Sequence, residues 1–324
     1  MDSVVGAGGE LIRNACGGNA LYAAAGAHIW DRRIGLVSRV GRGYPDACLA
    51  SIAAAVDTTG VRRLAADHPI RVAFAYRRDG SRTRTIPPEV LVAIPEDIRA
   101  DFVDSTQDDE RYLDATPTSS EIPLAWLGAA KGFHLPALLE VSHRDLVASI
   151  RRSQPAALIT VDAPWFARRD GTLSTDLAWL RDVDVVLPSE EDLAAFRPGI
   201  SIVSAARELA TLTRRGAVVK VGARGAIVAD GDGTLTHVSA YPADVVDPTG
   251  AGDGFCGGFL VGLRDAGDLA EAAAFGTVAA SFVVEAPAAI PIFDVARERA
   301  IERLPAVQAA IRRGIMSDKD WRTP

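Results

Sequence analysis

The chain has 324 residues, of which 48% are hydrophobic and 24% charged, and its formal net charge is −7. This length suits one large domain with an accessory element, and the acidity argues against a partner held through nucleic-acid phosphates. The most apolar long stretch, Ala272 to Val284, is too short to span a bilayer. The N-terminus lacks a basic region followed by an apolar core, so we expect no signal peptide, no membrane contact and a cytoplasmic location.

The N-terminal third begins its regular structure with a predicted strand at Ile34 to Val40 and a predicted helix at Pro45 to Val56. Residues 70–86 then form two alternating runs around Asp79-Gly80, which is a good hairpin signal. Half of this hairpin is arginine-rich, as expected for strands that are exposed on one face. Residues 87–123 are acidic and dotted with proline, which indicates a surface excursion with a short helix.

The middle of the chain alternates short apolar runs with helical patterns. This rhythm predicts an α/β fold with a mostly parallel sheet and helices on both faces, in which ligands bind at the carboxyl ends of the strands. The predicted strands are 157–161, 184–187 and 217–221, and the predicted helices are 173–181, 190–196 and 202–213.

The most informative stretch is Asp247-Pro248-Thr249-Gly250-Ala251-Gly252-Asp253. A β-like run at 243–246 precedes it, and a helical run rich in small residues continues to about Leu263. A strand that turns through glycines into a helix directs unpaired backbone N–H groups and the positive end of the helix dipole at one place, which makes an anion site. Asp253 lies inside this site, where its carboxylate can accept a proton from a substrate hydroxyl group. The pattern therefore indicates phosphoryl transfer to an alcohol.

A dinucleotide site is the alternative interpretation of the same residues, because Gly252, Gly254 and Gly257 fit the pattern G-x-G-x-x-G. The carboxylate of Asp253 would repel a pyrophosphate there. An acidic strand end does not follow about 20 residues later, since residues 268–285 read as an alanine-rich helix. Phosphoryl transfer is the favoured interpretation.

The stretch from Asp247 to Gly258 closely resembles the C-terminal signature of the ribokinase-like, or PfkB, carbohydrate kinases. The resemblance implies a single domain over residues 1–324, built as a three-layer sandwich with a small β-lid. It also implies ATP and Mg²⁺ as cofactors, Asp253 as the catalytic base, and an anion hole formed by Gly250, Ala251 and Gly252. Asp247 matches a position linked to a monovalent cation such as K⁺, although an Asp before Pro is also an ordinary turn initiator.

The substrate side of the site is implied by Gly17-Gly18, which precede a helical run. The family has a Gly-Gly motif here that contacts the sugar, and an ordinary N-capped helix is the alternative. Tyr22 stands where the motif usually has Asn, and Asn19 could supply the lost amide. Asp2 matches an acidic residue that holds substrate hydroxyl groups, which implies that the first core strand before it is missing or truncated. The expected lid segments are approximately 2–15 and 68–86.

The nucleotide side is implied by three further matches. Ser189 and Asp192 occupy the positions of an Asn-x-x-Glu motif that orders magnesium-bound water and phosphate, although helix capping also explains them. Lys220, Gly222 and Gly225 resemble a loop that lines the nucleotide site, where Lys220 could meet a phosphate, and a plain β-turn is the alternative. The small residues Gly276 and Ala280 would leave room for adenine, and core packing explains them equally well.

The predicted function is transfer of the γ-phosphoryl group of ATP to a primary hydroxyl group of a sugar or a similar small molecule. A nucleoside kinase of the adenosine type is one alternative. A catalytically weak metabolite-binding protein is the other, favoured by the changes at Tyr22, Ser189 and Asp192. The exposed lid sheet could pair two copies of the chain as a homodimer.

The cysteines predict little chemistry. Cys16, Cys48 and Cys256 are far apart in the sequence, and their spacing matches neither a metal site nor a disulfide framework. Cys256 follows the anion loop with no activating base nearby, which favours a buried packing residue over a nucleophile. The five histidines form no recognisable metal motif.

Overall fold

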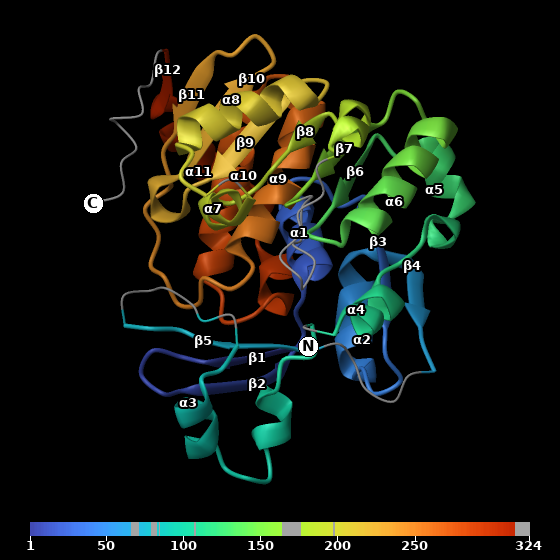
Figure 1. Ribbon diagram of the computed structural model, residues 1–324, viewed down its shortest axis with the longest axis vertical. Coiled ribbons are helices and arrows are strands. Elements are labelled where there is room, and N and C mark those ends of the chain that lie inside the picture. The colour runs from blue at the N-terminus through green and yellow to red at the C-terminus, as the bar shows by residue number, and fades with distance from the viewer. Residues whose placement is uncertain are drawn as a thin grey trace.

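The largest sheet has seven strands in the order β12-β11-β10-β9-β8-β7-β6 (Figure 1). The computed structural model describes residues 1–65, 71–78, 83, 85–106, 108–163, 176–196 and 198–314. Strands β6 to β9 run parallel, and the pairs from β9 to β12 are antiparallel. The bounds are β6 (Gly132–Leu135), β7 (Leu158–Val161), β8 (Val185–Val186), β9 (Gly216–Lys220), β10 (Ala226–Asp230), β11 (Leu235–Val238) and β12 (Ile311–Arg313).

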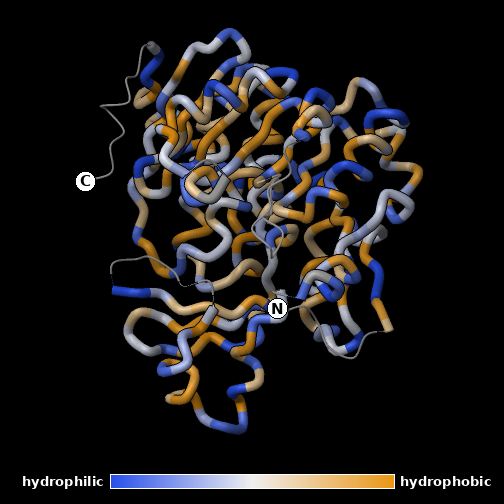
Figure 2. The backbone as a smooth tube through the Cα atoms, viewed as in Figure 1, coloured by the Kyte–Doolittle hydropathy of each residue, from blue (hydrophilic) through white to orange (hydrophobic). Residues whose placement is uncertain are grey.

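Helices cover both faces of this sheet because alternate strand residues point to opposite sides. In β9, Val218 belongs to one buried core, whereas Ala217 and Val219 belong to the other. The first core is shared with α1 (Asn19–His28), α9 (Ala251–Ala266), α10 (Leu269–Val284) and α11 (Arg297–Ala309). The second is shared with α6 (Glu140–Ser153), α7 (Glu190–Phe196) and α8 (Ile202–Leu212). The prediction of a three-layer α/β sandwich is confirmed, and Figure 2 shows the hydrophobic segments concentrated in the body of the molecule.

A separate three-stranded sheet, order β2-β1-β5, lies below the body in Figure 1. Its strands are β1 (Asp2–Val5), β2 (Leu11–Ala15) and β5 (Val72–Ala75), with β1 antiparallel to β2 and parallel to β5. The predicted turn at Asp79-Gly80 falls outside the described residues. On its far side, the Thr83 N–H donates to the Ala75 carbonyl at 2.8 Å. We call this sheet the lid sheet. That a core strand is missing before Asp2 stays a prediction.

The lid sheet is covered by part of the acidic stretch 87–123, which was predicted to be only a surface excursion. Phe102 is 1% exposed and packs with Val5, Ala73 and Ile94 in a third core. The segment therefore stabilises the lid sheet by burying apolar surface. It contains α3 (Pro88–Ala93), η1 (Arg99–Phe102), α4 (Asp109–Ala115), η2 (Ser119–Glu121) and, beyond it, α5 (Leu124–Ala129).

The remaining elements are not strands of the seven-stranded sheet or of the lid sheet. Strands β3 (Gly35–Val40) and β4 (Asp57–Arg63) form a parallel pair joined by α2 (Asp46–Ala55). The predicted helix at 173–181 is described only as the short 3₁₀ helix η3 (Ala178–Asp182), since residues 164–175 lie outside the described chain. Two more 3₁₀ helices are η4 (Gly222–Arg224) and η5 (Ile290–Asp294). Among the described helices, none combines the length and apolar composition needed to cross a bilayer.

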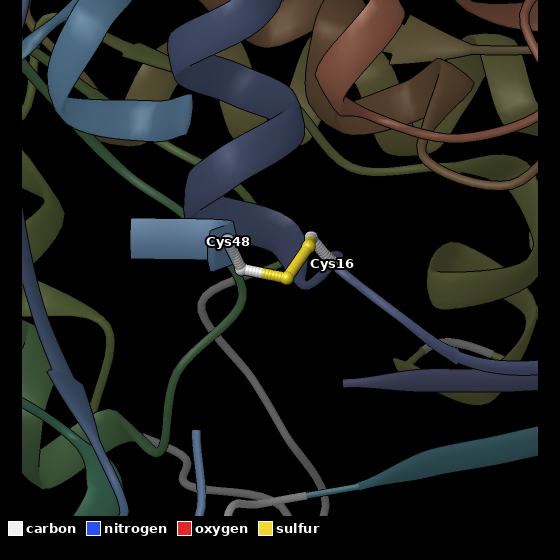
Figure 3. Close-up of a disulfide and its surroundings, with 2 residues drawn as sticks. All are labelled: Cys16 and Cys48. Carbon is white, nitrogen blue, oxygen red and sulfur yellow. A yellow bond between two sulfur atoms is a disulfide. The ribbon is translucent and has the colours of Figure 1, made fainter. Parts of the chain in front are cut away.

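The prediction of no disulfide is wrong. Cys16 and Cys48 are joined, with their Cα atoms 6.0 Å apart and 32 residues of sequence separation (Figure 3). Cys16 directly follows β2, and Cys48 lies in α2, so the bond ties the end of β2 in the lid sheet to α2. The spacing could not reveal this pair because folding, not sequence distance, brings the two cysteines together.

Reducing this disulfide is expected to destabilise the protein. Loop-closure entropy for a separation of 32 residues corresponds to about 4 kcal/mol, which lowers the Tm by about 5 °C in a chain of this size. The measurement is thermal unfolding with and without dithiothreitol. The double variant Cys16→Ser/Cys48→Ser is the control and should have the lowered Tm in both conditions. An unchanged Tm of the native protein on reduction would contradict a structural role for the bond.

Candidate active site

The anion loop enters α9 through a left-handed glycine. Gly250 has φ 77° and is the N-cap of α9, a conformation that glycine adopts without strain. A Cβ atom at Gly250 would also lie 2.1 Å from the Tyr22 ring, so the close contact itself requires glycine. The helical ladder begins with the Gly254 N–H donating to the Gly250 carbonyl at 2.8 Å. The N–H groups of Gly252 and Asp253 lie in the first turn, where a helix offers no internal acceptor.

The strand expected at 243–246 is absent, which corrects the sequence prediction. These residues have no strand hydrogen bonding, and Val245 and Val246 are 65% and 64% exposed. The chain is fixed instead by α10, because the N–H groups of Val246 and Asp247 both donate to the Val284 carbonyl, at 2.8 and 3.1 Å. The anion loop is therefore held by the end of a helix and not by a sheet.

Asp247 organises the turn before the anion loop. Its Oδ1 accepts hydrogen bonds from the Thr249 N–H at 2.9 Å and from the Thr249 hydroxyl group at 2.6 Å, a geometry typical of an Asp-initiated turn. The Thr249 hydroxyl group also contacts the Tyr76 hydroxyl group at 3.0 Å. Tyr76 directly follows β5, so this contact joins the lid sheet to the anion loop.

The predicted substrate residues lie together at the start of α1. The Gly18 N–H donates to Asp2 Oδ2 at 3.2 Å, and a Cβ atom at Gly17 would lie 1.8 Å from the same oxygen. Asn19 turns away, because its Nδ2 donates to the Ala137 carbonyl after β6 at 3.1 Å. Asn19 therefore positions the β6–α6 loop. Tyr22 is buried against the anion loop.

Three carboxylates surround the Tyr22 phenol. Burial raises its pKa above the usual value, and the negative charges of Asp2, Asp247 and Asp253 raise it further. Tyr22 is therefore a neutral hydrogen-bonding phenol at any pH near 7. The fold thus brings together three acidic residues from the lid sheet, the turn and the first turn of α9.

Tyr112 is a site residue that the sequence interpretation missed. Its hydroxyl group donates to the Ala137 carbonyl at 2.8 Å, the acceptor that Asn19 also uses. Burial raises its pKa to about 12, with a further contribution from the charge of Asp253. Nothing local marked this residue, because it belongs to the short helix α4 in the acidic stretch.

Lys220 lies directly beneath the anion loop, whereas the sequence predicted a contact with a nucleotide phosphate. Its Nζ donates to Asp162 Oδ2 at 2.7 Å and to Cys256 Sγ at 3.4 Å. A Cβ atom at Gly252 would lie 3.6 Å from this nitrogen. Burial alone would lower the pKa of Lys220, but the combined effect of Asp162, Cys256 and Asp192 outweighs it and raises the pKa. Lys220 is therefore a buried, charged ammonium group next to the anion loop.

Asp162 is the second residue that was missed. It directly follows β7 and is 6% exposed. The rule that ligand-binding residues follow the carboxyl ends of parallel strands could have identified it, since β7 was predicted from sequence. Cys256 is fully buried, as expected for a packing residue.

Ser189 and Asp192 form a capping arrangement at the start of α7. The Ser189 N–H and hydroxyl group donate to Asp192 Oδ2 at 2.8 and 2.6 Å, and the Asp192 N–H donates to Ser189 Oγ at 3.1 Å. This is the alternative that the sequence left open. Both residues still lie near the buried ammonium group, because Ser189 pairs with Lys220 in an isolated bridge.

The remaining predicted nucleotide residues divide into two groups. Gly222 and Gly225 make the turn from β9 to β10 with φ 58° and 97°, and a Cβ atom at Gly222 would meet open space. Gly276 is different, because it is buried against the Phe255 ring and carbonyl of α9. Core packing, the alternative that the sequence left open, accounts for Gly276, and a role in an adenine pocket stays a prediction. Ala280 on the same helix is half-buried.

Within the part of the chain that the structure describes, we find no group of three or more His, Cys, Asp or Glu side chains that could hold a metal ion. The described part of the site contains first-turn amides, the buried ammonium group of Lys220 and several carboxylates.

Several known proteins are similar to this chain in sequence or in structure. A cytidine kinase from Thermococcus kodakarensis is 26% identical over 270 residues, which cover 80% of this chain and 84% of that protein. A ribokinase structure from Giardia lamblia has a TM-score of 0.69 at 18% identity, covering 94% of this chain and 96% of that chain. A ribokinase II structure from E. coli, in complex with ATP and Mg²⁺, has a TM-score of 0.64 at 20% identity and covers 91% of each chain.

The family model described as pfkB family carbohydrate kinase matches residues 106–294, more than half of the chain. The matched region contains Asp162, Lys220, the anion loop and α9, and the structural neighbours share the ribokinase fold. The chain therefore belongs to the pfkB family of carbohydrate kinases.

Proposed function

We propose that the chain transfers the γ-phosphoryl group of ATP to a primary hydroxyl group of a sugar or nucleoside. The observation that carries this proposal is the position of Asp253 in the first turn of α9, three residues after Gly250 in its left-handed conformation. In this role Asp253 accepts the proton of the substrate hydroxyl group. The first-turn N–H groups of Gly252 and Asp253 stabilise negative charge on the transferring phosphoryl group. Ala251 completes the anion hole.

The remaining charges suit a phosphate-bearing cofactor. Lys220 adds a buried positive charge 3.6 Å from the Cβ position of Gly252, and the open turn at Gly222 leaves room for a nucleotide. Mg²⁺ carried on ATP supplies the charge that neutralises the phosphates. Carboxylate oxygens are the ligands that such cations prefer. We assign Asp192 to a magnesium-bound water and Asp247 to a monovalent cation such as K⁺.

A nucleoside acceptor is the second candidate. The negative charge of Asp2 or Asp253 contributes to raising the pKa values of three tyrosines, Tyr22, Tyr44 and Tyr112. Aromatic rings beside a hydroxyl-binding carboxylate suit a ligand that has a flat base as well as a sugar. The cytidine kinase that aligns over 80% of this chain supports the same class.

An ADP-release assay with cytidine, adenosine, ribose, fructose and a keto-deoxy sugar tests the proposal. Turnover of at least one acceptor supports phosphotransfer, and the preferred acceptor separates a sugar kinase from a nucleoside kinase. Tight binding of an acceptor by calorimetry without ATP turnover would instead identify a metabolite-binding protein.

A homodimer through the lid sheet and a cytoplasmic location are further proposals. Strand β2 is at the edge of the described lid sheet, and its side chains are exposed or half-buried, so its outer edge could pair with a second copy. A reducing cytoplasm would keep Cys16 and Cys48 as adjacent thiols, so the disulfide would form there only on oxidation.

Replacing Asp253 with Asn is expected to lower kcat by about 10²–10⁴-fold, because the amide cannot accept the substrate proton. ATP affinity should change by less than about threefold, since the amides of the anion loop remain. The measurements are steady-state kinetics and ATP titration by calorimetry.

Asp244→Asn is the matched control for that variant. Asp244 is an exposed carboxylate in the segment that leads to the anion loop, so its loss should leave kcat unchanged. Native kcat in Asp253→Asn, or an equal loss in Asp244→Asn, would refute the assignment of the base.

Replacing Lys220 with Met is expected to cost about 3–5 kcal/mol of stability, because Asp162 then becomes an unpaired buried charge. Adding Asp162→Asn should recover much of that stability. The double variant should still lose about tenfold or more in kcat, since the anion loop has lost its nearest positive charge. Thermal unfolding and kinetics are measured on the same samples. A stable double variant with native kcat would show that the pair is only structural.

A further inference from the structure

A pocket of about 410 Å³ lies at the far ends of α1 and α9, and nothing in the proposed reaction uses it. The helix α1 ends at His28 and α9 at Ala266, and their opposite ends carry the candidate active site. The pocket is lined by Ile29, Trp30, Asp31, Arg32, Arg33, Arg264 and Arg297.

Two of the four arginines are fixed by the fold. Arg264 Nη1 contacts Asp31 Oδ2 at 2.5 Å, and the same guanidinium group also bonds to Asp265. Arg32 donates to the Phe293 carbonyl at 3.3 Å and contacts His28. These two cations hold the walls of the pocket and contribute a fixed positive potential.

The other two arginines have exposed side chains. The side chain of Arg33 is 87% exposed, and its Nη2 and Nε donate to the Asp31 carboxylate at 3.3 and 3.4 Å, an exposed pair that contributes little stability. Arg297 is exposed at the first position of α11, and its guanidinium group has no ion-pair partner within the described chain. The floor between them is rigid, because Ile29 and Trp30 are buried and the Trp30 Nε1 donates to the Phe275 carbonyl at 3.2 Å.

The charge balance of the lining selects the class of ligand. The lining has four guanidinium groups and the carboxylate of Asp31, which pairs with Arg264 and Arg33. Arg264 also pairs with Asp265 next to the pocket, so these two carboxylates offset two of the four positive charges. Burial alone would raise the pKa of Asp31, but hydrogen bonds from Arg33 and Arg264 hold it at about 2, so this carboxylate stays ionised. The pocket therefore keeps a net positive charge, and guanidinium groups match the geometry of phosphate oxygens.

We propose that this pocket is an effector site for a small anion that carries a phosphoryl group, held between Arg33 and Arg297. The proposed ligand sits about one helix length from Asp253 and does not compete with the substrates. Its binding adds a bridge between the segment after α1 and the start of α11. Arg32 already links the segment after α1 to the Phe293 carbonyl of η5, just before α11.

The helices α1 and α9 connect the two sites. A Cβ atom at Gly257 would lie 1.8 Å from the Ala23 carbonyl oxygen, and one at Gly26 would lie 2.1 Å from the Gly254 carbonyl oxygen. Their backbones therefore touch without intervening side chains. The ion pair between Arg264 and Asp31 joins the same two helices at the pocket end. A ligand that stiffens this end is expected to stiffen the first turn of α9 as well.

Calorimetric titration with inorganic phosphate, pyrophosphate and ribose 5-phosphate tests the binding step. At least one anion should bind the native protein, and Arg33→Ala/Arg297→Ala should weaken that affinity by at least about tenfold. Arg207→Ala, which removes an exposed arginine of α8, and Asp253→Asn should bind as the native protein does. Thermal unfolding verifies that each variant is folded, and Arg297→Glu is a second variant with the same expected loss.

The same samples identify the source of the ligand and test the coupling between the pocket and the first turn of α9. Preference for ribose 5-phosphate over inorganic phosphate identifies a phosphorylated metabolite, and the reverse identifies free phosphate. Hydrogen exchange at residues 250–254 should slow on binding in the native protein and not in Arg33→Ala/Arg297→Ala. Binding that is equal in the double variant, or absent for all three anions, overturns the site. Binding without slower exchange overturns its role as an effector site. Neither readout depends on the kinase activity.

Discussion

The direct backbone contact between α1 and α9 is the constraint on which the rest of the structure depends. Gly26 and Gly257 allow carbonyl groups of the facing helix to occupy the space that side chains would fill. The segment that begins α1 at Gly18 is consequently fixed against the loop that begins α9 at Gly250, with the Tyr22 ring between them. Phosphoryl transfer requires acceptor and donor to be held in one geometry, and rigid helix packing is a way to provide it.

The electrostatics of the site explain why one buried lysine is retained. Asp2, Asp247 and Asp253 act together on Tyr22, so the cleft around this phenol is strongly acidic. An incoming phosphate would be repelled by these charges unless positive groups lay closer to it. The amides at the start of α9 and the ammonium group of Lys220 supply this positive potential from below the loop. Asp162 pairs with Lys220 and helps to keep it charged in its buried position.

Features with a local physical cause could be predicted from the sequence, and features that depend on distant contacts could not. The start of α9 was predicted because glycines before a run of small residues specify a helix N-terminus, and the strands β7 and β9 because apolar runs mark buried strands. Lys220 and Asp162 are 58 residues apart, so only the sheet brings them together. The strand expected at 243–246 was wrong because apolar residues favour a strand only where another strand can pair with them.

The contacts that attach the lid sheet to the rest of the chain differ in strength. Beside β2, Cys16 is covalently bound to Cys48 of α2, and the Gly18 N–H donates to Asp2 of β1 at 3.2 Å. Beside β5, the Tyr76 hydroxyl group contacts the Thr249 hydroxyl group of the anion loop at 3.0 Å. A hydrogen bond exchanges readily with water, whereas a disulfide does not. Admission of a substrate therefore has a preferred direction, in which β5 separates from the anion loop and β2 acts as the hinge. Such a motion would leave Gly17 and Gly18, next to the disulfide, in place to receive the hydroxyl groups of the acceptor.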